Sequence, residues 1–222
     1  MRATITIILI CVAIFIFMST LSPMEQKHMF DNYAFSGRNL MEGKFWVLIT
    51  SLFLHGNLTH LLFNMAALFF FGRALERDVD PTKFFTVFLL GGIAGNFVSL
   101  LFYPPSELFV GASGAIFAIV GMVMLADPFE FTFYPYLVPV PIGLVGVVYS
   151  IYTIMAFLFG GNPEVAYTAH LGGLAVGVLF GLRNATIKGI ISIILLFVIL
   201  LALPILFNVL GLLDYSKLLG SI

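Results

Sequence analysis

The chain has 222 residues, of which 61% are hydrophobic and only 9% charged, and its formal net charge is -1 at pH 7. Soluble domains carry roughly 25% charged residues, so this composition excludes a water-soluble core and indicates a polytopic membrane protein. The near-zero net charge argues against a nucleic-acid partner, and the single cysteine, Cys11, leaves no disulfide framework.

Seven apolar runs favour helices, because none of them alternates between polar and apolar residues as a transmembrane β-strand does. The sequence therefore predicts an all-α, polytopic membrane helix bundle that forms a single domain over residues 1–222. The first run resembles a signal peptide, but no small-residue cleavage site follows it, so we expect a retained helix. The predicted helices cover residues 4–21, 58 to beyond 72, 84–102, 113–126, 142–159, 168–182 and 190–210.

The segments between these runs differ in character. Residues 22–51 mix charged and aromatic side chains, which is typical of the headgroup zone, so short interfacial helices are expected there. Residues 127–141 are rich in proline and aromatic residues and predict a turn, and residues 160–167 predict a flexible loop.

The second predicted helix carries two polar residues on one face. His60 and Asn64 are four residues apart, Asn57 is placed to cap the helix, and His55 precedes it. A lone histidine in a soluble core is most often structural, whereas polar groups inside a membrane are costly and usually functional. We therefore interpret His60 and Asn64 as functional residues.

Ser113 begins the fourth predicted helix, between Gly111 and Gly114. A serine at a helix start is often only an N-cap, and that interpretation remains open. However, this helix is too short to cross the hydrocarbon, so its start is expected to lie below the membrane surface. That depth predicts a hydroxyl in a cavity that is open to water from one side, and it favours a functional role.

The sixth predicted helix carries one histidine and three glycines on a single stripe: His170, Gly173, Gly177 and Gly181. Glycines on a stripe let another backbone approach closely, and the fourth helix offers Gly114 and Ala118 four residues apart. Packing of these two faces is expected to bring the Ser113 oxygen within hydrogen-bond reach of the His170 ring. The alternative is ordinary packing of small residues with an incidental histidine.

These positions supply what hydrolysis of an amide needs: a nucleophile, a base and donors to the developing oxyanion. Ser113 is the candidate nucleophile and His170 the candidate base. The Ser113 amide, His60 and Asn64 are the candidate oxyanion donors. No acidic residue falls near His170 in the predicted helices, which favours a dyad over a triad. A zinc site of His55, His60 and His170 is the competing chemistry, but it lacks a carboxylate base and the His-Glu-x-x-His motif.

Access and orientation can also be predicted. The aromatic fifth helix and the loop after it are candidates for a lateral gate and cap, with Phe157 and Phe159 as the gate residues. Lysine and arginine residues are slightly more frequent on the side of the N-terminus, which places that end in the cytoplasm. In this orientation His60, Ser113 and His170 lie at helix ends that face the outer side.

Three motifs on separate predicted helices resemble those of the rhomboid intramembrane serine proteases: His55-x4-His60-x3-Asn64, Gly111-x-Ser113-Gly114 and Ala169-His170-x2-Gly173-x3-Gly177. The resemblance covers roughly residues 40–182. It implies a six-helix catalytic core in residues 1–182 and an extra C-terminal transmembrane helix in residues 183–222. It also implies cleavage of transmembrane protein substrates near their outer ends, in the cell membrane, without a cofactor, a metal or ATP.

The resemblance implies Ser113 as nucleophile, His170 as general base, and the Ser113 amide with His60 and Asn64 as the oxyanion hole. The implied supporting residues are His55, Gly111, Gly114, Phe117, Gly173 and Gly177. Phe117 stands where many members have a tyrosine that stacks on the catalytic histidine, and phenylalanine keeps the stacking surface. Val47 stands where the family often has arginine after Trp46, and Glu76 falls where it often has a structural glutamate.

Two readings from other functional classes remain. A non-catalytic membrane chaperone or binding protein on the same fold would usually lack the serine or the histidine. A transporter or channel that relays protons would place ionisable residues along a path across the membrane, whereas here they gather on one side. The sequence leaves the substrate and the oligomeric state open.

Overall fold

The structure is a computed structural model that describes residues 2–126, 131–133, 139–162, 165–183 and 185–209. Seven long helices account for most of this part of the chain: α1 (Arg2–Ser19), α5 (Leu58–Leu75), α6 (Pro81–Ser99), α7 (Ser113–Ala126), α8 (Ile142–Phe159), α9 (Tyr167–Leu182) and α10 (Ile187–Val209). The shorter elements are α2 (Pro23–Tyr33), α3 (Gly37–Met41), α4 (Val47–Thr50), the 3-10 turn η1 (Ser51–Phe53), β1 (Phe131–Phe133) and β2 (Pro139–Pro141). The predicted helical class and the short helices within residues 22–51 are therefore confirmed.

Four of the helices, α1, α5, α6 and α8, are long and apolar enough to cross a bilayer. Helices α7 and α9 and residues 187–202 of α10 are apolar but shorter than those four. The 14 residues of α7 rise about 21 Å, which is less than the about 30 Å of hydrocarbon in a bilayer. The chain is thus a multi-pass membrane protein.

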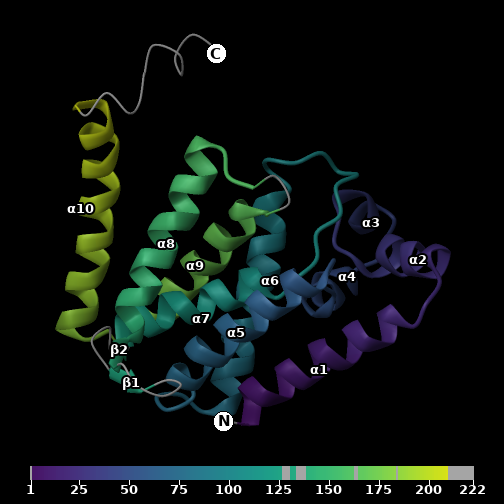
Figure 1. The fold of residues 1–222 in the computed structure, drawn as a ribbon, viewed down its shortest axis with the longest axis horizontal. Coiled ribbons are helices and arrows are strands. Elements are labelled where there is room, and N and C mark those ends of the chain that lie inside the picture. The colour runs from purple at the N-terminus through teal and green to yellow at the C-terminus, as the bar shows by residue number, and fades with distance from the viewer. Residues whose placement is uncertain (1, 127–130, 134–138, 163–164, 184, 210–222) are drawn as a thin grey trace.

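Helix α7 lies in the middle of the molecule, and α5, α6, α8, α9 and α10 all pack against it (Figure 1). Every residue from Gly114 to Leu125 is buried. Because no side of α7 contacts the surroundings over these residues, its first turn is held in place by its neighbours. A functional group at Ser113 therefore stands on the most enclosed element of the bundle.

Helix ends follow the capping residues in the sequence. The Asn57 side chain accepts a hydrogen bond from the His60 amide at 2.8 Å, as predicted for the start of α5. The Asp80 side chain accepts one from the Lys83 amide at 3.0 Å, with Pro81 as the first residue of α6. Such caps satisfy amides that have no partner inside the helix.

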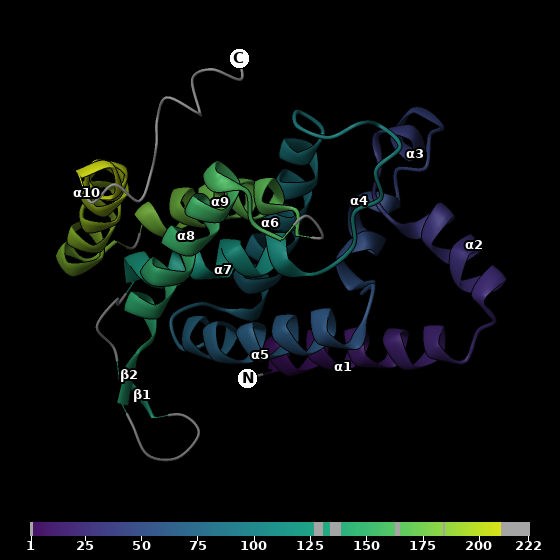
Figure 2. The ribbon, with the colours of Figure 1, turned by 45° about the horizontal axis from the view of Figure 1, so that its top comes forward.

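Helices α1 and α5 run side by side, and a carboxylate links them (Figure 2). The Ala3 amide donates a hydrogen bond to Glu76 Oε1 at 2.7 Å, so the acid at the end of α5 sits at the N-terminus of α1. Negative charge at a helix N-terminus interacts favourably with the helix dipole. This contact supplies the partner that the sequence did not identify for Glu76.

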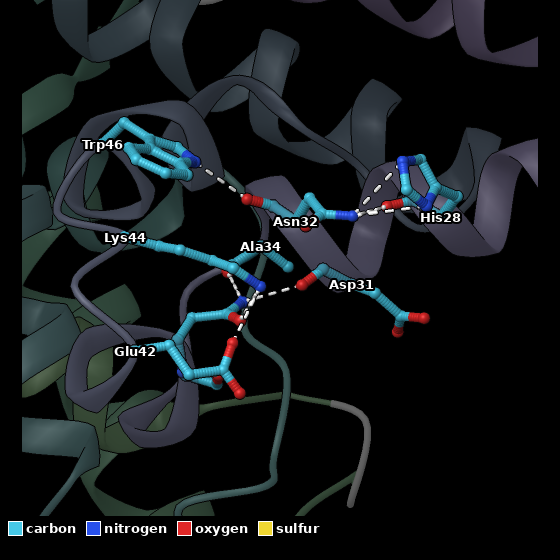
Figure 3. Close-up of polar contacts among 9 residues, drawn as sticks. His28, Asp31, Asn32, Ala34, Glu42, Lys44 and Trp46 are labelled. Atoms are coloured by element: carbon cyan, nitrogen blue, oxygen red, sulfur yellow. Dashed lines mark hydrogen bonds and ion pairs between the residues drawn. The ribbon is translucent and has the colours of Figure 1, made fainter.

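Residues 22–53 form a platform of short helices beside the bundle (Figure 1), and hydrogen bonds from side chains link these helices. The Trp46 indole donates to the Asn32 carbonyl at 2.9 Å, and the Asn39 amide donates to the Asp31 and Ala34 carbonyls at 3.0 Å each (Figure 3). These bonds satisfy backbone carbonyls at the end of α2. The platform is therefore a defined structure and not an extended loop.

Two segments differ from the prediction. Residues 131–133 and 139–141 pair as an antiparallel hairpin, with Thr132 opposite Val140, and this hairpin projects from the end of the bundle where α7 ends and α8 begins (Figure 2). Helix α10 begins at Ile187, three residues before the predicted start, because the Thr186 hydroxyl accepts from the Gly189 amide at 3.0 Å and caps the helix. The rest of the predicted turn (residues 127–130 and 134–138) and the predicted helix end at residue 210 lie outside the described residues.

Candidate active site

Glycines bring the backbones of α7 and α9 into direct contact. A Cβ atom at Gly173 would overlap the Gly114 carbonyl oxygen, and one at Gly177 would overlap the Ala118 carbonyl oxygen. Only glycine lets two helix backbones approach this closely. The predicted packing of the glycine stripe on α9 against Gly114 and Ala118 is therefore confirmed.

Aromatic rings fix the orientation of the His170 imidazole. The ring is 5% exposed and stacks on Phe117, with centroids 4.4 Å apart and planes at 14°. Tyr167 contacts it edge-on at 5.9 Å, and Tyr149 covers the Phe117 ring at 4.6 Å. Among the residues that the structure describes, the buried Nδ1 atom of His170 has no hydrogen-bond partner. Packing against aromatic rings therefore orients this imidazole.

Ser113 is the first residue of α7, so the residue at the N-cap position is Ala112. The Ile116 amide donates to the Ala112 carbonyl at 2.9 Å, which closes the first turn without the serine side chain. Ser113 and His170 line the same cavity. No hydrogen bond joins their side chains in the described part of the chain, and such bonds are often long before a substrate binds.

The loop before Ser113 lies against His60 and Asn64. Gly111 has a φ of +119°, and a Cβ atom on it would come within 2.6 Å of His60 Nε2 and 3.7 Å of Asn64 Nδ2. Glycine is therefore required there, both for the backbone angle and for the close approach. The Asn64 side-chain amide (Nδ2) also donates to the His60 backbone carbonyl at 3.0 Å. As a result, two side-chain donors lie beside the loop that leads to the serine.

His55 contacts the site indirectly. It is buried, and its ring meets the His60 ring edge-on with centroids 5.2 Å apart. Burial, together with the nearby His60, lowers the pKa of His55 to about 4, so this imidazole is neutral at pH 7. Within the described residues, no group of three or more histidine, cysteine and acidic side chains is placed to hold a metal ion.

The cavity has a volume of about 990 Å³, and α5, α6, the loop before α7, α8 and α9 all contribute to its wall. This volume suits a bound segment of peptide or another ligand of similar size. Phe63 of α5 and Tyr152 of α8 line it and are 75% and 58% exposed. The cavity therefore borders exposed aromatic side chains on two different helices.

The predicted gate residues lie elsewhere on α8. The Phe157 ring meets the Phe102 ring edge-on at 5.4 Å, just beyond the end of α6, and neither Phe157 nor Phe159 belongs to the cavity wall. Among the cavity-lining residues that sequence reasoning missed, Asn96 of α6 and Thr153 of α8 are buried polar residues. Both are polar residues in apolar helices, which is the signal that identified His60 and Asn64.

Fold and site together define a polytopic helical membrane protein whose cavity, lined by both polar and apolar residues, lies where α5, α7 and α9 begin. The family model of the Rhomboid domain matches residues 42–187, and the chain belongs to the rhomboid family. This agrees with the resemblance carried by the three motifs.

Among known relatives, the Bacillus subtilis (strain 168) protein YdcA is 36% identical over 151 residues, which cover 65% of this chain and 70% of YdcA. Rhomboid protease GluP of the same organism is 40% identical over 86 residues, which cover 38% of this chain and 16% of GluP. RHOMBOID-like protein 12, mitochondrial, of Arabidopsis thaliana is 29% identical over 172 residues, which cover 70% of this chain and 51% of the plant protein. The chain thus spans only part of the length of these relatives.

Proposed function

We propose that this protein is an intramembrane serine endopeptidase that cleaves transmembrane protein substrates with a Ser113–His170 dyad. The observation that carries the proposal is that both residues line one cavity, with the imidazole stacked on Phe117. A buried, oriented base beside a serine at a helix N-terminus is the arrangement that activates a hydroxyl nucleophile.

In this mechanism the Ser113 oxygen attacks the substrate carbonyl while His170 accepts the hydroxyl proton. His170 then returns that proton to the leaving amine, and water completes hydrolysis of the acyl-enzyme by the reverse sequence. The Ser113 amide, His60 and Asn64 donate to the oxyanion. One such donor is worth about 3–4 kcal/mol of transition-state stabilisation in known enzymes.

The substrate is a transmembrane protein that enters from the lipid bilayer, and the proposed gate is the outer part of α8 with Phe157 and Phe159. The protein lies in the cell membrane with its N-terminus in the cytoplasm and its cavity open to the outer side. The C-terminal helix α10 is an addition to a six-helix catalytic core. The reaction requires neither a cofactor nor ATP.

The test is cleavage of a model transmembrane substrate by purified protein in liposomes. Wild-type protein is expected to cleave it, Ser113→Ala to have no activity above background, and Ser106→Ala, an exposed serine in the loop before α7, to behave as wild type. Cleavage that persists in Ser113→Ala would overturn the proposal. Binding of the substrate without any cleavage by wild-type protein would instead favour the non-catalytic alternative.

A further inference from the structure

Asn96 of α6 is a buried amide on the cavity wall to which the sequence assigns no role. It is 6% exposed, and its Nδ2 atom donates to the Ser51 hydroxyl at 3.1 Å and to the Leu48 carbonyl at 3.4 Å. An amide in an apolar helix is costly to bury without partners. These two bonds therefore fix the end of α4 and the start of η1 against α6.

Ser51 connects this amide to the loop of the site. It is 1% exposed, its side chain receives the bond from Asn96, and its carbonyl accepts a hydrogen bond from the Gly111 amide at 2.9 Å. Gly111 is the residue whose backbone lies against His60, and it comes two positions before Ser113. A continuous series of contacts thus runs from Asn96 through Ser51 to the loop that carries the serine.

The same loop is held at a second point. Phe35 of the platform and Phe109 exchange backbone hydrogen bonds of 2.8 and 3.0 Å. Phe109 is therefore fixed by the platform, and Gly111 by Ser51. These two attachments therefore fix the position of the peptide groups that follow, up to the Ser113 backbone amide.

We propose that Asn96 is a positioning residue that sets the Gly111–Ser113 segment through Ser51 and so places the Ser113 amide for the oxyanion. This proposal rests on the proposed function of Ser113. It follows because oxyanion donors must be in place before the reaction, and a misplacement of about 1 Å costs up to about 100-fold in rate. Loss of the Asn96 amide leaves the Ser51 hydroxyl without its donor and frees the Ser51 backbone to shift.

The experiment is a double-mutant cycle of Asn96→Ala and Ser51→Ala. The readouts are the labelling rate of Ser113 by a fluorophosphonate probe, kcat and KM for a transmembrane substrate, and the melting temperature, all in liposomes. The labelling rate and kcat are expressed per folded molecule. Each single variant is expected to lower the labelling rate and kcat about tenfold with KM nearly unchanged. The double variant is expected to be no slower than the slower single one, because both changes break one series of contacts.

Two further variants separate positioning from a general loss of structure. Ser51→Thr keeps the hydroxyl and is expected to label near the wild-type rate. Ser99→Ala removes a different buried hydroxyl, on α6, that bonds to Thr168 at 3.1 Å, and it is expected to lower the melting temperature without slowing labelling. If Asn96→Ala does not fold, the labelling rates of Ser51→Ala and Ser51→Thr show whether the Ser51 hydroxyl positions the loop.

Wild-type labelling rates in Asn96→Ala and Ser51→Ala, or rate losses that multiply in the double variant, would overturn the proposal. Equal rates in Ser51→Ala and Ser51→Thr would do the same. If the wild-type protein is not labelled at all, the proposed function fails, and hydrogen exchange then tests the positioning alone. In that case residues 108–113 are expected to exchange faster in Asn96→Ala than in wild type, and unchanged exchange would overturn the inference.

Discussion

The two helices that line the cavity beside α7, α9 and α8, are packed in opposite ways. Helix α9 meets α7 through backbone contacts at Gly173 and Gly177, where no side chain intervenes. Helix α8 buries only one face, while Tyr152, Leu158 and Phe159 are exposed. One wall of the site is therefore closed by glycine contacts, and the other is held by side chains that have room to move.

This difference separates two requirements of an enzyme that acts on a segment from the lipid. The base must keep its position relative to the nucleophile, and contacts between backbones with no space between them provide that. A polymeric substrate must also enter, and an element with few buried contacts is the one able to open. We therefore expect substitutions on α9 to abolish folding or catalysis and substitutions on α8 to alter entry of the substrate.

The largest effect is expected from Gly173→Ala, which tests the backbone contact between α9 and α7. The added methyl group overlaps the Gly114 carbonyl oxygen, and backbone cannot move aside as a side chain does. We expect a loss of about 3 kcal/mol in the free energy of unfolding, at the upper end for overpacked cores, together with loss of activity. Thermal or denaturant unfolding in detergent measures it.

Gly56→Ala is the matched control, because beyond its two chain neighbours no atom of the described residues lies within 4 Å of the Cβ position there. It is expected to change stability by less than about 0.5 kcal/mol. Wild-type stability in Gly173→Ala would show that α7 and α9 are not in backbone contact.

A smaller effect is expected from Phe117→Leu, which removes the ring under His170 but keeps an apolar side chain. Because stacking on Phe117 orients the imidazole, the labelling rate of Ser113 is expected to fall by about 10- to 100-fold. Phe84→Leu, at another fully buried phenylalanine of the core, is expected to lower stability without slowing labelling per folded molecule. Equal labelling rates in the two variants would contradict a role for the stack.

Phe157→Ala tests whether α8 controls access of the substrate to the cavity. This change removes the contact with Phe102 and is expected to free the outer part of α8, raising turnover of a transmembrane substrate by about threefold. Phe197→Ala, at an exposed position of α10, is expected to leave turnover unchanged. An unchanged or lower rate in Phe157→Ala would count against α8 as the gate.

The smallest effect is expected far from both walls, at Glu76. Burial raises the pKa of this carboxyl, but hydrogen bonds such as that from the Ala3 amide outweigh it, so the pKa lies below its ordinary value. A lowered pKa contributes stability above the unfolded-state value, and this contribution is lost as the pH falls through the folded-state pKa. Glu76→Gln is expected to cost about 0.5 kcal/mol at pH 7, since solvent screens a partly exposed group, and to reduce the loss of stability on acidification. Identical pH profiles for the two proteins would contradict the account.

Sequence periodicity predicted much of this arrangement. The glycine stripe of α9, the shared face of His60 and Asn64, and the cap at Asn57 all follow from spacing within one helix. Apart from the packing of that stripe on α7, contacts between distant segments did not follow from it, because no local pattern records them. Asn96 and Ser51 are 45 residues apart in the chain, and their bond is visible only in the folded structure.

The packing of α8 illustrates the same limit. Its aromatic residues predicted a mobile wall, but the sequence does not say which of them face the cavity. The structure places Tyr149 and Tyr152 on the cavity wall and Phe157 against Phe102. The functions of Ser113, His170 and the gate residues stay predictions, because geometry brings side chains together without showing that they react.

The most direct test of the account is reaction of the wild-type protein with a fluorophosphonate probe, followed by mass spectrometry of the modified residue and by the same reaction in His170→Ala. The account predicts a single adduct on the Ser113 oxygen of the wild-type protein and labelling at background level in His170→Ala. An adduct on a different residue, or equal labelling of Ser113 in both proteins, would contradict a nucleophile activated by His170.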